Sequence, residues 1–280
     1  RKFVEKIDQV TFSGEYAAKN GKRVIYDTER CVLTLTPDGL ELTEVAHNEV
    51  SRLDMIITQF LRAIRPAKPT LARERIDYLL DEGSWERLAS DAREAAGPID
   101  VLINNAGVSQ RSLAQDTELA DERRLMELNY FAPIGLTRAV LPEMVERGTG
   151  RIVVVSSVAG YVGTPLRSSY AASKHALRGY FDSLRAELHG TGVGVTIVCP
   201  GYVRTEIATN AVSAAGQVHG KMDAAIAGGM DAVKCAVEIA DAIQRGRSEL
   251  HVGGREVYAI YLKRLLPKVV ERIVPRLAPK

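Results

Sequence analysis

The stretch VLINNAGVSQ, residues 101–110, is a short apolar run that ends abruptly in two asparagines, an alanine and a glycine. Such a run is typical of a buried strand that opens onto a ligand. The runs RIVVVSS (151–157) and VGVTIVCPG (193–201) share its continuous Val and Ile content, and ELHVGG (249–254) repeats it more weakly. Strands that are buried on both faces have this composition. Because helical segments alternate with these runs, the pattern predicts βαβ units and a parallel sheet from about Trp85 onward.

The three strong runs each end in a small or polar residue, at Asn104, Ser156 and Pro200. Ligands of open α/β sheets bind just beyond the carboxyl ends of the strands, so these ends predict one shared site. The alternative is that small polar residues only terminate strands and start turns. That alternative would be a good explanation for one such strand end, but it is a poorer explanation for three of them together.

The stretch SSYAASKHAL (168–177) places Tyr170 and Lys174 four residues apart, and therefore on one face of a helix. A positive charge beside a phenol lowers its pKa from the ordinary value of about 10. A tyrosine whose pKa is lowered in this way can exchange protons with an alcohol or a ketone near neutral pH. The Y-x-x-x-K pattern alone is common. Ser157, at the mouth of the neighbouring strand, strengthens it because its hydroxyl can hold the substrate oxygen that Tyr170 protonates.

Five motifs together resemble the short-chain dehydrogenase/reductase (SDR) family. They are NNAG (104–107), ELNYFAPIGLTRAVLP (127–142), IVVVSSVAG (152–160), YAASK (170–174) and CPGYVRTEI (199–207). They follow the order and spacing of the family from Trp85 to the C-terminus, about 70% of the chain. Within the family the chain is most similar to the membrane-associated SDR-family-member-7-like reductases, because RSLAQDT (111–117) follows NNAG and VGGREVYAIYLKRLLP (252–267) closes the chain.

The resemblance implies hydride transfer between the nicotinamide of NADP or NAD and a carbonyl or secondary alcohol. In that scheme Tyr170 is the general acid and base, and Lys174 lowers its pKa and binds the nicotinamide ribose. Ser157 orients the substrate oxygen, and Asn129 helps to hold a water of the proton relay. The alternative for Asn129 is a buried asparagine that is satisfied by the backbone.

The family also implies further cofactor and substrate contacts. The adenosine side of the cofactor would be lined by Asn104, Ala106 and Gly107, and the nicotinamide amide and pyrophosphate would be covered by Pro200, Gly201, Val203 and Thr205. The substrate would be faced by Ser109, Gln110, Gly163, Thr164 and Tyr202. The expected substrate is a small lipophilic carbonyl or alcohol. The Ala- and Gly-rich segment 206–230 is interpreted as a substrate lid or as an ordinary small-residue helix and loop.

The phosphate-binding half of the family pattern is missing. No T-G-x-x-x-G-x-G turn and no G-x-G-x-x-G follows a strand pattern anywhere, and GVGVTI at residue 192 precedes a strand. Backbone amides at a helix N-terminus ordinarily neutralise a pyrophosphate, and the sequence offers no substitute. The residues that choose between NAD and NADP are also absent.

The N-terminal third resembles other families. Val10 to Ala46 is similar to the C-terminal part of acyl-CoA:acetate/3-ketoacid CoA-transferases, with a predicted hairpin that turns at Pro37, Asp38 and Gly39. The nucleophilic glutamate of that family lies in a part that is not represented here, so transferase activity does not carry over. Glu49 to Glu82 resembles a histidine-kinase dimerisation helix and linker. The alternative, which fits the segment as well, is an ordinary amphipathic helix that Pro66 and Pro69 end.

The predicted organisation has three parts: a CoA-transferase-like fragment (1–48), a helical linker segment (49–84) and a truncated SDR catalytic domain (85–280). The fold class is α/β, with a Rossmann-like parallel sheet that lacks its first βαβ portion and follows an unrelated N-terminal hairpin and helix. We interpret the whole as a chimeric or wrongly assembled reading frame. Loss of the first strand would leave VLIN as an apolar edge. The only nearby candidates to pair with this edge are the hairpin strands CVLTLT and LELTEV. Their apolar and polar residues alternate, which suits a one-sided antiparallel sheet better than a sheet that is buried on both faces.

Composition narrows the function classes. A net charge of +2 and a pI near 8.4 argue against nucleic-acid binding. The three cysteines have no metal-site spacing, so no metal is expected. The sequence has no leader-like or spanning segment, so a cytoplasmic location is expected.

The basic amphipathic tail predicts a peripheral membrane contact or a docked terminal helix. A homodimer through helices 125–144 and 170–188 is also expected. Two alternatives to an oxidoreductase stay open: a non-catalytic SDR remnant that acts in dimerisation or membrane association, and a CoA-ester binding module.

Overall fold

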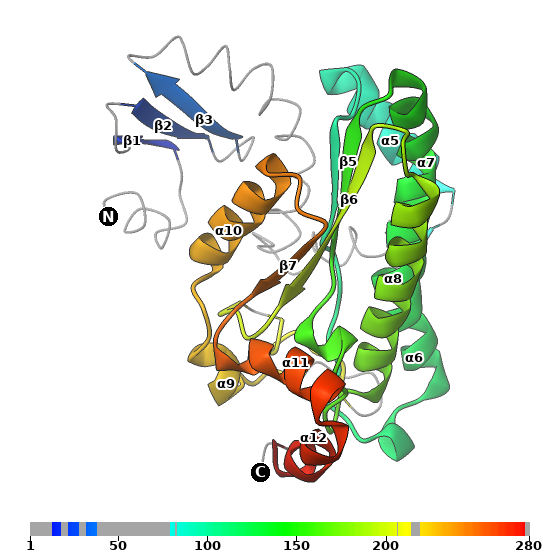
Figure 1. Cartoon of the computed structure of the whole chain (residues 1–280), viewed down its shortest axis with the longest axis vertical. Coiled ribbons are helices and arrows are strands. Elements are labelled where there is room, and N and C mark those ends of the chain that lie inside the picture. Colours follow the sequence, from blue (N-terminus) through cyan, green and yellow to red (C-terminus); the bar gives the residue numbers. More distant parts are fainter. Residues whose placement is uncertain are drawn as a thin grey trace.

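A computed structural model of the 280-residue chain describes residues 13–17, 22–27, 32–37, 79–81, 83–205, 207–213 and 219–277. In these residues the chain forms a three-stranded and a four-stranded sheet (Figure 1). The strands are β1 (Ser13–Ala17), β2 (Lys22–Asp27), β3 (Val32–Pro37), β4 (Val101–Asn104), β5 (Gly150–Val155), β6 (Val193–Pro200) and β7 (Glu249–Val252). The α-helices are α5 (Ser84–Ala96), α6 (Leu119–Met126), α7 (Ala132–Arg147), α8 (Ser168–Glu187), α9 (Ala224–Ala227), α10 (Ala232–Gln244), α11 (Tyr258–Leu265) and α12 (Pro267–Ile273).

Short turns of other helix types complete the described elements. A π-helix, η2 (Glu127–Phe131), joins α6 to α7 without a break. The 3₁₀ turns are η1 (Ala114–Asp116), η3 (Val158–Gly160), η5 (Arg255–Val257) and η6 (Val274–Leu277). Single π-turns inside longer helices often mark functional sites, and η2 contains Asn129.

The four-stranded sheet is parallel throughout and has the order β4-β5-β6-β7. Its strands fall on the four apolar runs of the sequence, so the predicted parallel α/β sheet is confirmed. Helices α7 and α8 cover one face and α10 covers the other (Figure 1). Burial on both faces is the reason that the strands carry continuous apolar residues rather than an alternating pattern.

The strand β4 is the edge of this sheet within the part of the chain that the structure describes. It pairs with β5 alone, yet all four of its residues are buried. The predicted apolar edge at VLIN is therefore present in the described residues. The strand β3, which falls on the predicted CVLTLT strand, pairs antiparallel with β2 and belongs to the other sheet. The expectation that this strand suits an antiparallel sheet is confirmed.

Several predictions for the N-terminal third lie outside the described residues. They are the turn at Asp38 and Gly39, the LELTEV strand and the amphipathic helix of 49–82 up to residue 78.

Helix α5 is held against α7 by the only tryptophan of the chain. The ring of Trp85 lies so close to Gly135 that a Cβ on that glycine would come 1.8 Å from Cε3. The indole Nε1 donates a hydrogen bond to the Leu79 carbonyl oxygen at 3.0 Å. Glycine is therefore required inside α7, where alanine would otherwise be preferred.

Candidate active site

Helix α8 presents Tyr170 and Lys174 at the carboxyl end of the sheet, and Gln110 caps its first turn. The Oε1 atom of Gln110 accepts hydrogen bonds from the backbone amides of Ser169, at 2.8 Å, and Tyr170, at 3.3 Å. First-turn amides of a helix have no partner within the helix, so a buried glutamine from the loop after β4 satisfies them. The expectation that Gln110 faces the substrate is wrong, because its amide group is engaged by the protein and positions the helix that carries Tyr170.

The phenol of Tyr170 is buried, and the Ser157 hydroxyl lies near enough to it to affect its pKa. Ser157 follows β5 and caps η3, where its Oγ accepts a hydrogen bond from the Ala159 amide at 3.1 Å. Burial raises the pKa of Tyr170, and the hydrogen bond from Ser157 together with the guanidinium groups of Arg167 and Arg111 opposes that rise. The arrangement brings the expected proton donor and the expected substrate-orienting hydroxyl together.

The ammonium of Lys174 lies in the same buried region. Its Nζ donates a hydrogen bond to the Val155 carbonyl oxygen at 2.8 Å and stands 5.9 Å from the centroid of the Tyr170 ring. Burial lowers the pKa of Lys174 to about 8. An ammonium has three hydrogens, so two remain for other acceptors such as ribose hydroxyls. The expected effect of Lys174 on the pKa of Tyr170 stays a prediction.

Asn129 is completely buried in η2 and binds the loop that follows β4. Its Oδ1 accepts from the Val108 amide and its Nδ2 donates to the Val108 carbonyl, both at 2.9 Å. Nδ2 also donates to the Ser173 hydroxyl at 3.1 Å. These contacts are those of a buried asparagine that is satisfied by the backbone, which was the alternative interpretation of Asn129. Its role in holding a water stays a prediction. Gly107 lies against the same side chains, since a Cβ there would come 2.9 Å from Asn129 Oδ1 and 3.5 Å from Lys174 Nζ.

The residues expected to bind the cofactor lie in the loops after β4 and β6. Asn104 donates from Nδ2 to Thr137 at 3.1 Å, and its buried Oδ1 has no hydrogen-bond partner in the described structure. The Gly201 amide donates to Val252 at 2.8 Å, and Ser157 Oγ lies 3.5 Å from the Pro200 carbonyl. The remaining members of the set, Ala106, Val203 and Thr205, are half-buried in the same loops.

Two arginines beside Tyr170 were not found by sequence reasoning. Arg111 is buried and forms an ion pair with Asp223, and Arg167 Nη2 lies 3.6 Å from the same carboxylate. Asp223 belongs to the Ala- and Gly-rich segment, so this ion-pair cluster connects that segment to the site. The only sequence feature that could have identified these arginines is their position, since Arg111 follows the NNAG loop and Arg167 precedes SSY.

A cavity of about 110 Å³ opens beside Ser157. Thr164 and Tyr202, which were expected to face the substrate, line it together with Arg167. Its other wall comes from the C-terminal helices and is apolar, with Ala259, Leu262, Val270, Ile273 and Val274. The Ser157 hydroxyl therefore adjoins a space with one polar end and one apolar wall.

Comparison with known proteins agrees with this geometry. The family profile described as "short chain dehydrogenase" matches residues 42–216, which is more than half of the chain. The chain belongs to the short-chain dehydrogenase family. The profile match begins before Trp85 and so extends over the segment 49–82, whose resemblance to a kinase helix stays a prediction.

Relatives within the short-chain dehydrogenase family support the subgroup that the sequence indicated. "Dehydrogenase/reductase SDR family member 7B" of Rattus norvegicus is 41% identical over 203 residues, covering 72% of this chain and 62% of that protein. "Dehydrogenase/reductase SDR family protein 7-like" of Anopheles gambiae is 42% identical over 188 residues, covering 67% and 59%. The chain thus spans about 62% of the length of the member 7B relative that it matches.

Solved structures of the family have the same fold. A short-chain dehydrogenase from Streptomyces avermitilis matches with a TM-score of 0.58 and 31% identity, covering 70% of this chain and 75% of that one. A short chain dehydrogenase/reductase from Burkholderia phymatum in complex with NAD matches with a TM-score of 0.59 and 25% identity, covering 72% of this chain and 77% of that one. A short chain dehydrogenase from Burkholderia cenocepacia in complex with NADP matches with a TM-score of 0.58 and 25% identity, covering 72% of this chain and 76% of that one.

Proposed function

We propose that this chain is an NAD(P)(H)-dependent oxidoreductase that interconverts a carbonyl and a secondary alcohol. The observation that carries the proposal is the buried phenol of Tyr170 near the Ser157 hydroxyl, with the ammonium of Lys174 5.9 Å from its ring, at the carboxyl end of the parallel sheet. NAD and NADP are both compatible with this arrangement.

The polar groups of the site suit a dinucleotide. Lys174 has two ammonium hydrogens that can bind the nicotinamide ribose diol. On the side expected for the adenosine, the buried Oδ1 of Asn104 is an acceptor without a protein partner in the described residues. The pyrophosphate half has no equivalent in the sequence, which has no glycine-rich phosphate turn. Nucleotide affinity is therefore the quantity that separates an active enzyme from a non-catalytic remnant.

The side chains can divide the acid and base work as follows. When bound, the dinucleotide supplies or accepts the hydride at the substrate carbon. In the direction of reduction, Ser157 donates a hydrogen bond to the carbonyl oxygen, and Tyr170 transfers its phenolic proton to that oxygen as charge develops on it. Lys174, Arg167 and Arg111 are cations near the phenolate that results, so they stabilise it until a proton returns.

The cavity beside Ser157 supports a lipophilic substrate. Its apolar wall comes from α11, α12 and η6, while Thr164, Tyr202 and Arg167 place polar groups near the hydroxyls. A carbonyl compound with an apolar tail would leave no polar group unpaired against that wall.

We expect replacement of Lys174 by methionine to weaken binding of NADPH and NADH by roughly 10- to 100-fold, because a charged hydrogen-bond donor to the ribose is lost while the side-chain volume is kept. The wild-type affinity should fall as the pH rises through about 8, the pKa of Lys174, since the protonated form binds the ribose oxygens better. The Lys174→Met affinity should not change over that range. Fluorescence titration of both nucleotides measures these affinities.

Lys234→Ala is the matched control, since it removes an exposed lysine of α10 far from these contacts. Its nucleotide affinity should equal that of the wild type. If neither nucleotide binds the wild-type chain, the oxidoreductase proposal fails, and the catalytic residues belong to a non-catalytic SDR remnant. The other alternative, a CoA-ester binding module, would show saturable binding of acetyl-CoA instead.

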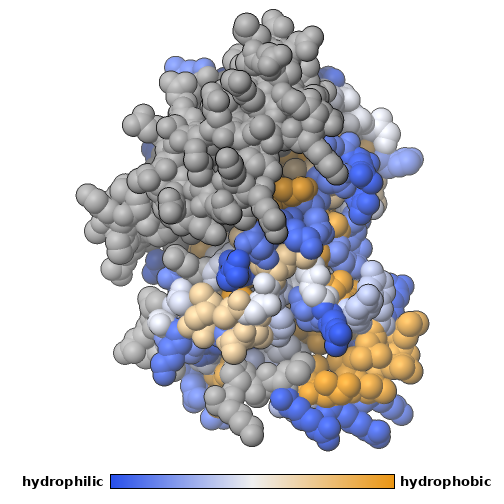
Figure 2. All heavy atoms as spheres, turned by 90° about the vertical axis from the view of Figure 1, so that its left-hand side faces the viewer, coloured by the Kyte–Doolittle hydropathy of each residue, from blue (hydrophilic) through white to orange (hydrophobic). Residues whose placement is uncertain are grey.

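A membrane contact of the C-terminal helices is a second proposal, and exposed apolar residues favour it. The exposed large apolar residues of α11, α12 and the single residue between them are Tyr258, Tyr261, Leu265, Leu266, Val269 and Ile273. Figure 2 shows an apolar patch low on the molecule, at the height of α11 and α12 in Figure 1, with hydrophilic residues beside it. Lys263, Arg264, Lys268 and Arg272 lie on the same helices. Among the described residues, no helix is long and apolar enough to cross a membrane.

We expect the chain to sediment with vesicles that contain phosphatidylserine and to bind phosphatidylcholine vesicles less tightly. Basic residues attract anionic lipids, and the apolar side chains enter the interface. Leu265→Ser and Leu266→Ser should each weaken binding by roughly tenfold, because each removes the burial of one leucine. Val237→Ser, which changes an exposed valine on α10, should have no effect. Equal binding of all variants would contradict a contact through α11 and α12. Homodimerisation through the helices around Asn129 and Tyr170 stays a prediction.

A further inference from the structure

A second cluster of reactive side chains lies on the other two strands of the sheet, β6 and β7. Cys199 and His251 are direct partners in the parallel register of these strands. Glu249 stands two residues before His251 and therefore points to the same face of the sheet. Cys199 Sγ, one carboxylate oxygen of Glu249 and one ring nitrogen of His251 all lie within 4.8 Å of one another. The pairing of the strands thus brings together three residues that have no motif spacing in the sequence.

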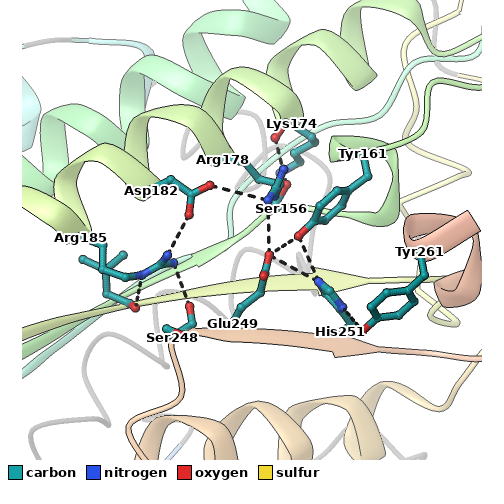
Figure 3. Close-up of polar contacts among 11 residues, drawn as sticks. Ser156, Tyr161, Lys174, Arg178, Asp182, Arg185, Ser248, Glu249, His251 and Tyr261 are labelled. Atoms are coloured by element: carbon teal, nitrogen blue, oxygen red, sulfur yellow. Dashed lines mark hydrogen bonds and ion pairs between the residues drawn. The ribbon is translucent and has the colours of Figure 1, made fainter. Parts of the chain in front are cut away.

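The ring of His251 is oriented by an outer contact (Figure 3). Its Nδ1 lies 2.9 Å from the hydroxyl of Tyr261 on α11. When Nδ1 donates its proton to that hydroxyl, Nε2 keeps its lone pair and faces Glu249 Oε1 at 3.4 Å and the Tyr161 hydroxyl at 3.1 Å. Histidines that bind metals are usually held in this way, with the second nitrogen donating to an oxygen.

We propose that Cys199, Glu249 and His251 form a binding site for a divalent transition-metal ion, with Zn²⁺ as the ion that fits best. One sulfur, one nitrogen and one oxygen donor are the ligand types that Zn²⁺ accepts. Bonds of about 2 Å in a tetrahedron place two ligand atoms roughly 3.3 Å apart, close to the 3.4 Å between His251 Nε2 and Glu249 Oε1. Cys199 binds as the thiolate and its proton passes to solvent. The fourth position is left for water or the Tyr161 hydroxyl.

Access and charge both bear on this site. The sulfur of Cys199 is fully buried and His251 is largely buried, while the Glu249 side chain is 36% exposed, so an ion enters from the side of Glu249. Arg178 of α8 competes for that carboxylate, because its Nη2 lies 3.5 Å from Glu249 Oε1 and its guanidinium stacks on the Tyr161 ring at 3.5 Å. Arg178 has a second partner in Asp182 at 3.7 Å, so it can release Glu249 without becoming unpaired.

The test of this site does not require turnover. Cobalt replaces zinc in such sites and reports its ligands by absorption. Titration of the full chain with CoCl₂ should give a thiolate-to-cobalt charge-transfer band in the near ultraviolet and visible bands of a tetrahedral ion, with one ion bound per chain. Zinc should displace the cobalt and abolish these bands. The absence of a charge-transfer band at saturating cobalt would overturn the proposal.

Variants identify the ligands. Cys199→Ser should abolish the charge-transfer band, whereas Cys235→Ser, which alters the other free cysteine among the described residues, should keep it. Tyr261→Phe removes only the outer contact to His251 and should weaken zinc binding by roughly 10- to 100-fold. Arg178→Gln should instead tighten it, since the competitor for Glu249 is lost. An adventitious ion would bind all four variants equally, and that result would also overturn the site. Near-ultraviolet circular dichroism of each variant shows whether the fold is kept.

Discussion

Replacing Tyr170 by phenylalanine is expected to lower kcat for carbonyl reduction by roughly 10²- to 10⁴-fold, the range that a positioned proton donor contributes. The substitution removes one oxygen from a buried ring and leaves the volume of the site almost unchanged. The substrate oxygen would keep its hydrogen bond from Ser157 but would receive no proton. Dinucleotide affinity should stay near the wild-type value, because the loss falls on the chemical step. Steady-state kinetics with a lipophilic ketone and fluorescence titration of NADPH measure the two quantities.

Tyr180→Phe is the matched control for this prediction. Tyr180 lies on the same helix, and its ring packs edge-on against Tyr130 and Phe181 away from Ser157 and Lys174. Removal of its hydroxyl should leave kcat unchanged. Equal loss in both variants would indicate a general effect on α8, and an active Tyr170→Phe enzyme would show that another group donates the proton.

Replacing Phe181 by alanine should lower the free energy of unfolding by about 3–5 kcal/mol. Phe181 is completely buried in the C-terminal half of α8 and belongs to the same core cluster as Ile152 and Val154 of β5 and Ile197 of β6. The truncation loses the transfer free energy of the ring and leaves a cavity between the helix and the sheet. Domains of this kind have total stabilities of about 5–15 kcal/mol, so the loss is large enough to decide whether the chain folds.

Urea denaturation followed by the fluorescence of Trp85, the only tryptophan, measures this loss. The control is Phe131→Ala, which removes a ring of the same size that is 43% exposed at the end of η2. Its expected cost is below about 1 kcal/mol, because the site is partly solvated before the change. Similar losses for the two variants would show that α8 does not pack on the sheet as described.

The parallel sheet and the pairing of Tyr170 with Lys174 on one helix face could be predicted because their signals are local. A strand buried on both faces has to carry a continuous apolar run, and β4, β5 and β6 do so. Tyr170 and Lys174 share a helix face through their spacing alone. The small and polar residues at the strand ends meet because parallel strands end at the same edge of a sheet. Family resemblance then added the roles of these residues.

The α/β class, the candidate catalytic residues and the apolar edge that β4 forms within the described residues could therefore be predicted from the sequence. The distant side chains that meet these residues could not be predicted in this way. Gln110 caps α8, Asp223 joins Arg111 to Arg167, and Cys199 faces His251. None of these contacts has a periodic signature, since each depends on how loops cross the sheet or on the register of two strands far apart in the chain. Periodicity reports the burial of a residue within its own element, whereas contacts between elements follow from packing, and packing requires the whole fold.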